Sequence, residues 1–254
     1  MILSRRVALN NSQLDEVHTS IVIRGVDTGV PHESISTVNR MGGFGQRVTG
    51  QHYESLDVNV TFAIDIPYTD LATRRTTYES ALRWANQTGW LTVSYMPSRR
   101  LRVDKTVLPS GGDLWQWTND FTVTFRAYAM PFWQDATATT STSSSIAVPG
   151  NLQTVCSAEI ANATGSTIND LEVQAGSSQM TFASLGLANG ETLKIGHTDD
   201  GLVTIRIYTS STSYRDAYSK RTVSSDDDLY VDPGTRGLYV SGGTATFSCY
   251  GRYA

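Results

Sequence analysis

Regular alternation of apolar residues over 56–66 constrains the fold more than any other feature of the chain. An apolar side chain stands at every second position, and the set comprises Leu56, Val58, Val60, Phe62, Ile64 and Ile66. Because successive side chains of a strand point to opposite faces, this pattern predicts a strand with one buried face. A second alternating segment, 121–129, predicts another such strand. Shorter strands are predicted at 20–26, 90–95 and 101–107.

Residues 70–88 break the strand pattern and predict one amphipathic helix. Thr69 or Asp70 can cap its N-terminus, and Gly89 can end it. At 100° per residue, one apolar stripe joins Leu71, Tyr78, Ala81, Leu82 and Ala85. Arg74 falls on the same stripe and interrupts its first turn. We expect the helix to pack on a sheet as a structural element.

A segment rich in Ser and Thr, 134–151, divides the chain. All five Trp precede it, so the two sides differ in their core chemistry. We therefore predict two domains, 1–134 and 135–254. The segment itself can be a flexible linker or an exposed strand leading into the second domain. Beyond it, short apolar runs alternate with Gly, Asn and Asp turns, which predicts an antiparallel β-sandwich.

The stretch RMGGFGQRVTG at 40–50 has the glycine content of a phosphate-binding loop but lacks its chemistry. Val48 stands where a dinucleotide fingerprint needs Gly, and Gln51 and His52 stand where a P-loop needs Lys and Ser or Thr. A strand pattern follows it, whereas both motifs lead into a helix. We expect instead that 33–40 and 46–54 pair as a hairpin, whose turn uses the glycines.

The tip of this hairpin supplies the candidate interface residues. A lone two-stranded hairpin is only marginally stable in water, and this one carries Met41 and Phe44 at its tip. We expect the arm to fold against a neighbouring subunit, where Met41 and Phe44 become buried and Arg40 or Arg47 can form ion pairs. Arg40, Met41, Phe44 and Arg47 are the oligomer-interface candidates.

The remaining motifs do not select a reaction. His197, Asp199 and Asp200 share one turn, and 224–234 is expected to be an exposed acidic turn. Turn-forming roles explain both more simply than a bound cation does. Trp115 and Trp117 share one strand face, which suits a sugar platform or, more simply, a core or subunit contact. No Gly-x-Ser-x-Gly motif is present, and nothing selects a carboxylate pair for glycoside hydrolysis. We expect no enzymatic activity and no catalytic, cofactor-binding or metal-binding residues.

Composition argues against further classes of protein. The 254-residue chain has a formal net charge of −4, which disfavours recognition of nucleic acid. No apolar run approaches the roughly 18 residues of a membrane span, and the N-terminus lacks the apolar segment of a signal peptide. Cys156 and Cys249 are expected to be buried, reduced thiols, although a disulfide is possible if their strands pair.

Several segments, taken in order, carry a family resemblance. FTVTFRAYAMPFWQD at 121–135 is an alternating strand pattern followed by Pro and two aromatic residues. Three more segments lie near the C-terminus: LGLANGETLKIGHTDDGLVTIRI at 185–207, SSDDDLYVDPGTRGLYVSGG at 224–243 and ATFSCYGRYA at 245–254. Together with the predicted helix and hairpin, these segments resemble the distal tail protein (Dit) family of siphophages, which are long, flexible-tailed bacteriophages.

The resemblance implies a mainly β fold. It implies an N-terminal β-barrel-like domain with one α-helix and a long hairpin arm, followed by a C-terminal galectin-like β-sandwich. It also implies a homohexameric ring in the phage tail tip, assembled in the host cytoplasm, which joins the tail tube to the baseplate hub or tail-associated lysin. Receptor-binding proteins can attach to such a ring, and no catalytic residue carries over. The alternative is a carbohydrate- or receptor-binding module of a phage or bacterial surface assembly.

Overall fold

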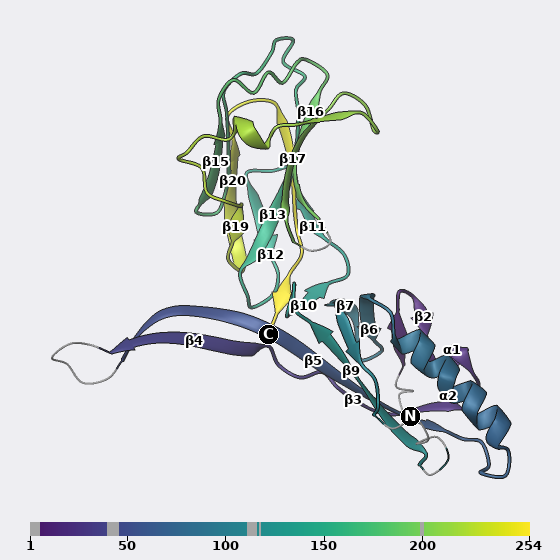
Figure 1. Ribbon diagram of the computed structural model, residues 1–254. Coiled ribbons are helices and arrows are strands. Elements are labelled where there is room, and N and C mark those ends of the chain that lie inside the picture. The colour runs from purple at the N-terminus through teal and green to yellow at the C-terminus, as the bar shows by residue number, and fades with distance from the viewer. Residues whose placement is uncertain (1–5, 40–45, 111–115, 117, 199–200) are drawn as a thin grey trace. The chain divides into compact units, whose positions relative to one another are not determined.

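The computed structural model describes residues 6–39, 46–110, 116, 118–198 and 201–254 (Figure 1). It divides the chain into two compact units, Met1–Trp133 with Ala254, and Gln134–Tyr253. This division falls one residue before the boundary expected from the sequence. The chain is mainly β, as predicted, and its sheets are built largely from antiparallel strand pairs. No helix among the described residues is long and apolar enough to cross a membrane.

The first unit contains two sheets. One has the strand order β3 (Ile21–Asp27), β5 (Gln46–Ile64), β9 (Asp120–Ala127) and β8 (Lys105–Val107), and β4 (His32–Asn39) also pairs with β5. The other includes the neighbours β2 (Ser12–Gln13), β1 (Val7–Leu9), β6 (Gly89–Val93) and β7 (Met96–Val103). A four-residue helix, α1 (Leu14–Val17), follows β2. The described strands do not close into a barrel, so the barrel-like unit is open.

The predicted alternation in β5 is confirmed. Leu56, Val58, Val60, Phe62 and Ile64 are each at most 1% exposed. The polar residues between them pair across the sheet on the opposite face: Asn59 accepts from the Thr124 hydroxyl at 2.7 Å, and Asp57 accepts from Arg126 Nε at 3.1 Å. One strand therefore supplies both the core of the unit and a hydrogen-bonded polar face.

The longest helix among the described residues, α2 (Leu71–Ala85), packs on β9. Asp70 is the N-cap, and its carboxylate accepts from Thr73 N–H at 3.2 Å. The Tyr78 ring lies 4.7 Å from that of Phe121, and the Trp84 ring lies 6.0 Å from that of Phe125. The burial of Trp84 was not predicted.

Two details of the predicted helix are wrong. The helix ends at Ala85, where Asn86 N–H donates to the Leu82 carbonyl, and Gly89 already begins β6. Leu71 is 44% exposed, because the face that meets the sheet begins one turn later, at Arg74.

Arg74 is fully buried rather than an interruption of the apolar face. Its guanidinium donates to the carbonyls of Ile64 (3.3 Å), Ile66 (2.5 Å) and Thr118 (3.0 Å) and to the side-chain oxygen of Asn119 (3.1 Å). It also lies 4.3 Å from the centroid of the Tyr68 ring. A buried charge needs such partners, so Arg74 joins the end of β5 to the start of β9.

The second unit is a β-sandwich, as predicted. One sheet has the order β11 (Thr139–Ser141), β21 (Thr244–Cys249), β13 (Thr154–Ala161), β16 (Thr192–His197), β17 (Val203–Tyr208) and β18 (Tyr214–Asp216), with β19 (Tyr230–Val231) also on β13. The other has the order β12 (Ser145–Val148), β20 (Gly234–Val240), β14 (Leu171–Ala175) and β15 (Ser178–Phe182). The remaining elements are β10 (Trp133–Asp135), the 3-10 turn η1 (Tyr218–Lys220) and β22 (Arg252–Tyr253). The two sandwich sheets share one apolar core. The Ser/Thr-rich segment supplies β11 and β12, so of its two predicted forms the strand is the correct one.

Cys156 and Cys249 face each other across β13 and β21. Both are buried, free thiols, as predicted. Burial raises the pKa of the Cys156 thiol to about 12 and that of the Cys249 thiol to about 11. Both groups are therefore protonated at neutral pH, and they pack as small apolar side chains.

Candidate functional site

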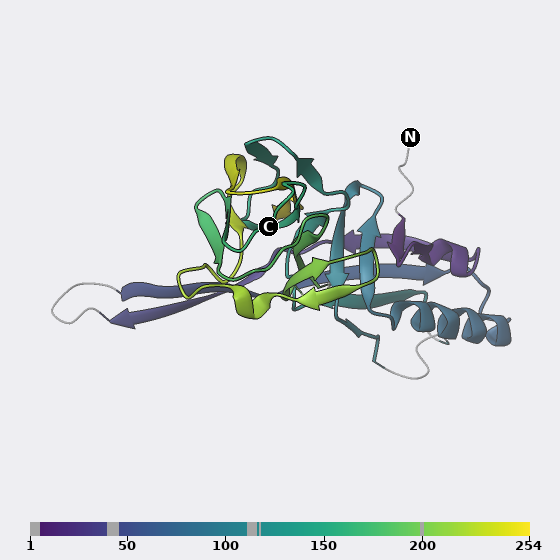
Figure 2. The same cartoon turned by 90° about the horizontal axis from the view of Figure 1, so that it is seen from above.

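The hairpin arm of the first unit is the candidate assembly element. The predicted pairing of its two strands is confirmed: His32 lies opposite Ser55, and Asn39 lies opposite Gln46. The partners β3 and β9 join β5 only from residue 56 onward. The arm is thus a two-stranded ribbon of about 30 Å at roughly 3.3 Å per residue. Figures 1 and 2 both show it running away from α2.

The described part of the arm has little cover within the chain. On β4, the side chains of 32, 33 and 35–37 are exposed, and Ile35 is 53% exposed. Val30, just before the strand, is 77% exposed. A ribbon of two strands buries too little surface to be stable alone, so the arm needs a surface to pack against.

Three of the four predicted interface residues, Arg40, Met41 and Phe44, lie outside the described residues. Arg47 is within β5, where its backbone is opposite Val38, and its side chain also lies outside the described set. The arm that carries these residues is therefore observed, and their contacts remain a prediction. Trp115 and Trp117, the alternative sugar platform, likewise lie outside the described residues.

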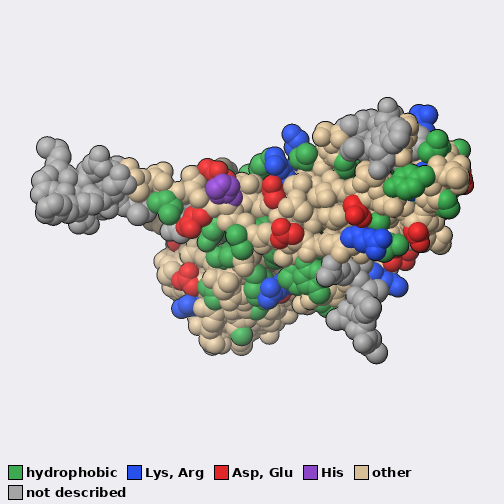
Figure 3. Space-filling view, turned by 90° about the horizontal axis from the view of Figure 1, so that it is seen from below, with side chains coloured by type: hydrophobic (Ala, Val, Ile, Leu, Met, Phe, Trp, Pro, Cys, Tyr) green, Lys and Arg blue, Asp and Glu red, His purple; other side chains and the backbone are tan. Residues whose placement is uncertain are grey.

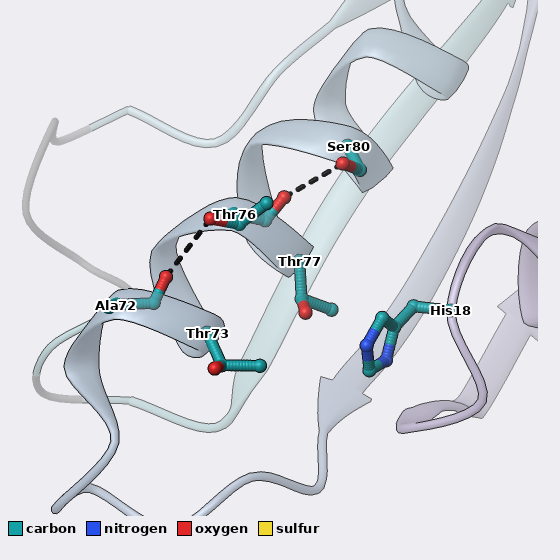
Figure 4. Close-up of a pocket in the computed structure, with 6 residues that line it drawn as sticks. All are labelled: His18, Ala72, Thr73, Thr76, Thr77 and Ser80. Atoms are coloured by element: carbon teal, nitrogen blue, oxygen red, sulfur yellow. Dashed lines mark hydrogen bonds between the residues drawn. The ribbon is translucent and has the colours of Figure 1, made fainter.

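A shallow hollow of about 260 Å³ lies between α2 and the segment before β3. Figure 4 shows His18 facing Thr73 and Thr77 across it. The other hydroxyls are already engaged: Thr76 donates to the Ala72 carbonyl at 3.1 Å, and Ser80 donates to the Thr76 carbonyl at 2.8 Å. The surface that lines the hollow is mostly apolar, and its lining residues include no carboxylate to pair with His18, as a reaction would need.

A hydrogen-bonded array of Ser157, His197 and Asp228 lies in the second unit. The carboxylate of Asp228 accepts from His197 Nε2 at 2.8 and 2.9 Å, and Ser157 Oγ lies 3.3 Å from His197 Nδ1. Asp228 is 4% exposed, so the prediction of an exposed acidic turn is wrong at this residue. Asp199 and Asp200, the other members of the predicted His197 cluster, lie outside the described residues.

The array joins the segment around Asp228 and Leu229 to strand β13 of the sandwich. Asp228 Oδ1 also accepts from Leu229 N–H at 2.7 Å, and the Leu229 carbonyl accepts from Cys156 N–H at 2.8 Å. Desolvation lowers the pKa of the nearby Arg252 guanidinium to about 10, and the Asp228 carboxylate acts in the opposite direction. Ser, His and Asp also make up hydrolase triads, but Ser157 lies within the paired strand β13 rather than on a turn above a substrate. We interpret the array as structural.

The Asp228→Ala variant is expected to destabilise the second unit by about 3 kcal/mol, because it removes the acceptor of two buried donors and the anion beside Arg252. Hydrogen exchange of 226–231 and of β13 measures the effect. The matched control is Asp227→Ala, since the Asp227 side chain is 93% exposed and its ion pair with Arg221 is expected to contribute little. Equal exchange in the two variants would contradict the structural interpretation.

No charged patch marks a polyanion-binding surface on the face shown in Figure 3. Basic and acidic side chains are interspersed there, and neither sign gathers.

The chain resembles known proteins in its structure. No family model and no curated protein matches the chain. Among solved structures, the SPP1 Dit protein (gp 19.1), described as a paradigm of the hub adsorption apparatus in phages that infect Gram-positive hosts, matches with a TM-score of 0.71. The match covers 98% of this chain and 99% of that one at 16% identity. The chain has the Dit fold.

Two structures of the phage P2 baseplate in its activated conformation are more distant. The one with Ca has a TM-score of 0.47 at 7% identity, and the one with Sr has 0.49 at 6%. Each match covers 97% of both chains. These scores are too low to support an argument, so the Dit fold assignment rests on the SPP1 protein.

Proposed function

We propose that the chain is a structural distal tail protein, the baseplate hub of a long-tailed bacteriophage. Six copies form a ring that joins the tail tube to the tip apparatus for host adsorption. The observation that carries this proposal is the likeness to SPP1 Dit, which extends over nearly the full length of both chains. The role is assembly rather than catalysis.

The solvent-exposed arm supports the proposal that six copies of the chain form a ring. A ring closes only if two different surfaces of one chain complement each other. A ribbon that reaches about 30 Å from its sheet can supply one such surface, since it can extend onto the body of the next copy. The arm is stabilised by contact with that neighbour.

The partners follow from the position of a hub. The tail tube protein binds one side of the ring, and a tail-associated lysin or hub protein binds the other. Receptor-binding proteins attach through the second unit. The protein is a component of the virion tail tip and assembles in the host cytoplasm.

The mass of the protein in solution tests whether the ring forms. Sedimentation and mass photometry of the full chain are expected to give a species near six times the 27.7 kDa chain mass, because the arm becomes buried only in the assembly. Electron micrographs of the same sample are expected to show closed rings. A chain that stays monomeric at about 10 μM would overturn the hexamer, since the subunit contacts of a stable ring hold at that concentration.

A further inference from the structure

The outward face of β13, β16, β17 and β18 carries an ordered row of charges. Glu159, Lys194, Arg206 and Asp216 lie side by side across the four strands, as their register pairs show. Lys194 Nζ lies 2.8 Å from a Glu159 carboxylate oxygen. The intervening residues of β16 and β17 are buried in the sandwich core, so the charged row faces outward.

Two tyrosines lie beside this row on the same face. Tyr208 is opposite Tyr214, and their ring centroids are 5.3 Å apart with an interplanar angle of 40°. Lys194 Nζ lies 5.3 Å from the Tyr208 ring centroid, and the Arg206 guanidinium carbon lies 4.4 Å from that of Tyr214. We name Glu159, Lys194, Tyr208, Arg206, Tyr214 and Asp216 the tyrosine face.

The tyrosine face is accessible and held in place before any ligand arrives. Tyr214 is 51% exposed, and the Glu159 side chain is 57% exposed. The ion pair and the two cation–π contacts restrict the long side chains, which lowers the entropy lost on binding.

Its charges indicate the kind of ligand. The two acids and two bases of the row cancel, so the face has no net charge to attract an ionic polymer. It nevertheless offers carboxylate acceptors, ammonium and guanidinium donors, and phenol groups that do both. Aromatic rings beside such groups suit a ligand with an apolar ring surface and many hydroxyls.

We propose that the tyrosine face binds a neutral saccharide. The sugar ring packs against Tyr214 and Tyr208, and its hydroxyls bond to the charged row. A protein partner fits less well, because the centre of a protein interface is usually depleted of charge, whereas this row sets four charges beside the rings. The proposal goes beyond the hub function and does not depend on ring formation.

Saturation-transfer NMR with the full chain tests the proposal. The neutral probes are lactose, maltotetraose and chitotetraose, and a hyaluronan tetrasaccharide is the anionic probe. At least one neutral probe is expected to receive saturation at its ring protons, with a Kd on the order of 1 mM because the face is open rather than a deep pocket. Binding of the anionic probe alone, or of no probe at about 10 mM, would overturn the proposal.

Variants locate the site. Tyr214→Ala is expected to weaken the neutral probe about tenfold, while Tyr239→Ala, a tyrosine of β20 with 50% exposure, leaves its affinity unchanged. Glu159→Gln removes one charge with little change of shape, and it is expected to weaken the same probe severalfold. Equal affinity of the Tyr214→Ala and Tyr239→Ala proteins would show that the sugar binds elsewhere and would refute the assignment.

Discussion

The Arg74→Met variant is expected to lose about 3 kcal/mol or more of the unfolding free energy of the first unit. Methionine fills much of the arginine volume but donates no hydrogen bond. The carbonyls of Ile64, Ile66 and Thr118 then lose a buried donor, and an unsatisfied buried polar group costs about 1–3 kcal/mol. Arg74→Lys is expected to recover only part of the loss, because one ammonium cannot reproduce the planar fork that reaches both segments.

Tryptophan fluorescence in a urea titration measures this effect in the correct unit, since all five Trp precede residue 134. The matched control is the neighbouring Arg75→Met. The Arg75 side chain is 64% exposed and pairs with Glu79 one turn along the helix, so the expected change is at most about 0.5 kcal/mol. If the two methionine variants unfold at the same urea concentration, the proposed role of Arg74 is wrong.

The sequence predicted the elements that depend on local pattern. Burial of every second residue in β5 follows from the two-residue period of its apolar side chains. The N-cap at Asp70 was predictable because its carboxylate lies only three residues before the N–H of Thr73, which donates to it. The hairpin was predictable because its two strands are separated in the sequence by only a short glycine-rich segment. Its register shifts between His32 and Glu33 and between Ser36 and Thr37 have no comparable signal.

The residues that sequence reasoning misjudged are those whose partners are remote. In the sequence, Arg74 looks out of place on an apolar stripe. Its acceptors are the carbonyls of Thr118, 44 residues away, and of Ile64 and Ile66, and only the fold brings them to it. Asp228 lies among other acidic residues, and only the position of His197, 31 residues earlier, distinguishes it. A single basic residue on an otherwise apolar helical stripe is the sequence signal that could have suggested a buried arginine.

The tyrosine face was missed for a related reason. Glu159, Lys194, Arg206 and Tyr214 come from four strands, and each is an ordinary surface residue within its own segment. Their alignment depends on strand order and register, which the turn signals of the second half do not fix. Along the sequence, the most visible aromatic cluster is instead the pair Trp115 and Trp117.

Loss of Met41 and Phe44 is expected to break the proposed ring. Serine at both positions removes two apolar side chains from each subunit contact, and burial of such a side chain contributes about 1.5–3 kcal/mol. Each contact then weakens by about 100-fold or more, and the hexamer gives way to monomer at micromolar concentration. Ile35→Ser, on the observed shaft of the arm, is expected to weaken the ring to a smaller extent because it removes one such side chain.

Mass photometry across a dilution series measures both effects. Leu202→Ser is the control: Leu202 is 68% exposed in the second unit, so the variant removes a comparable apolar side chain away from the arm, and the ring is expected to persist. Unchanged tryptophan fluorescence in the monomeric variant would show that the first unit stays folded. The double variant, Met41→Ser with Phe44→Ser, and the Leu202→Ser variant could dissociate at the same concentration. That result would rule out the arm tip as the contact but would not contradict the hexamer. If the wild-type protein is itself a monomer, the proposed hexamer is wrong, whatever the arm variants do.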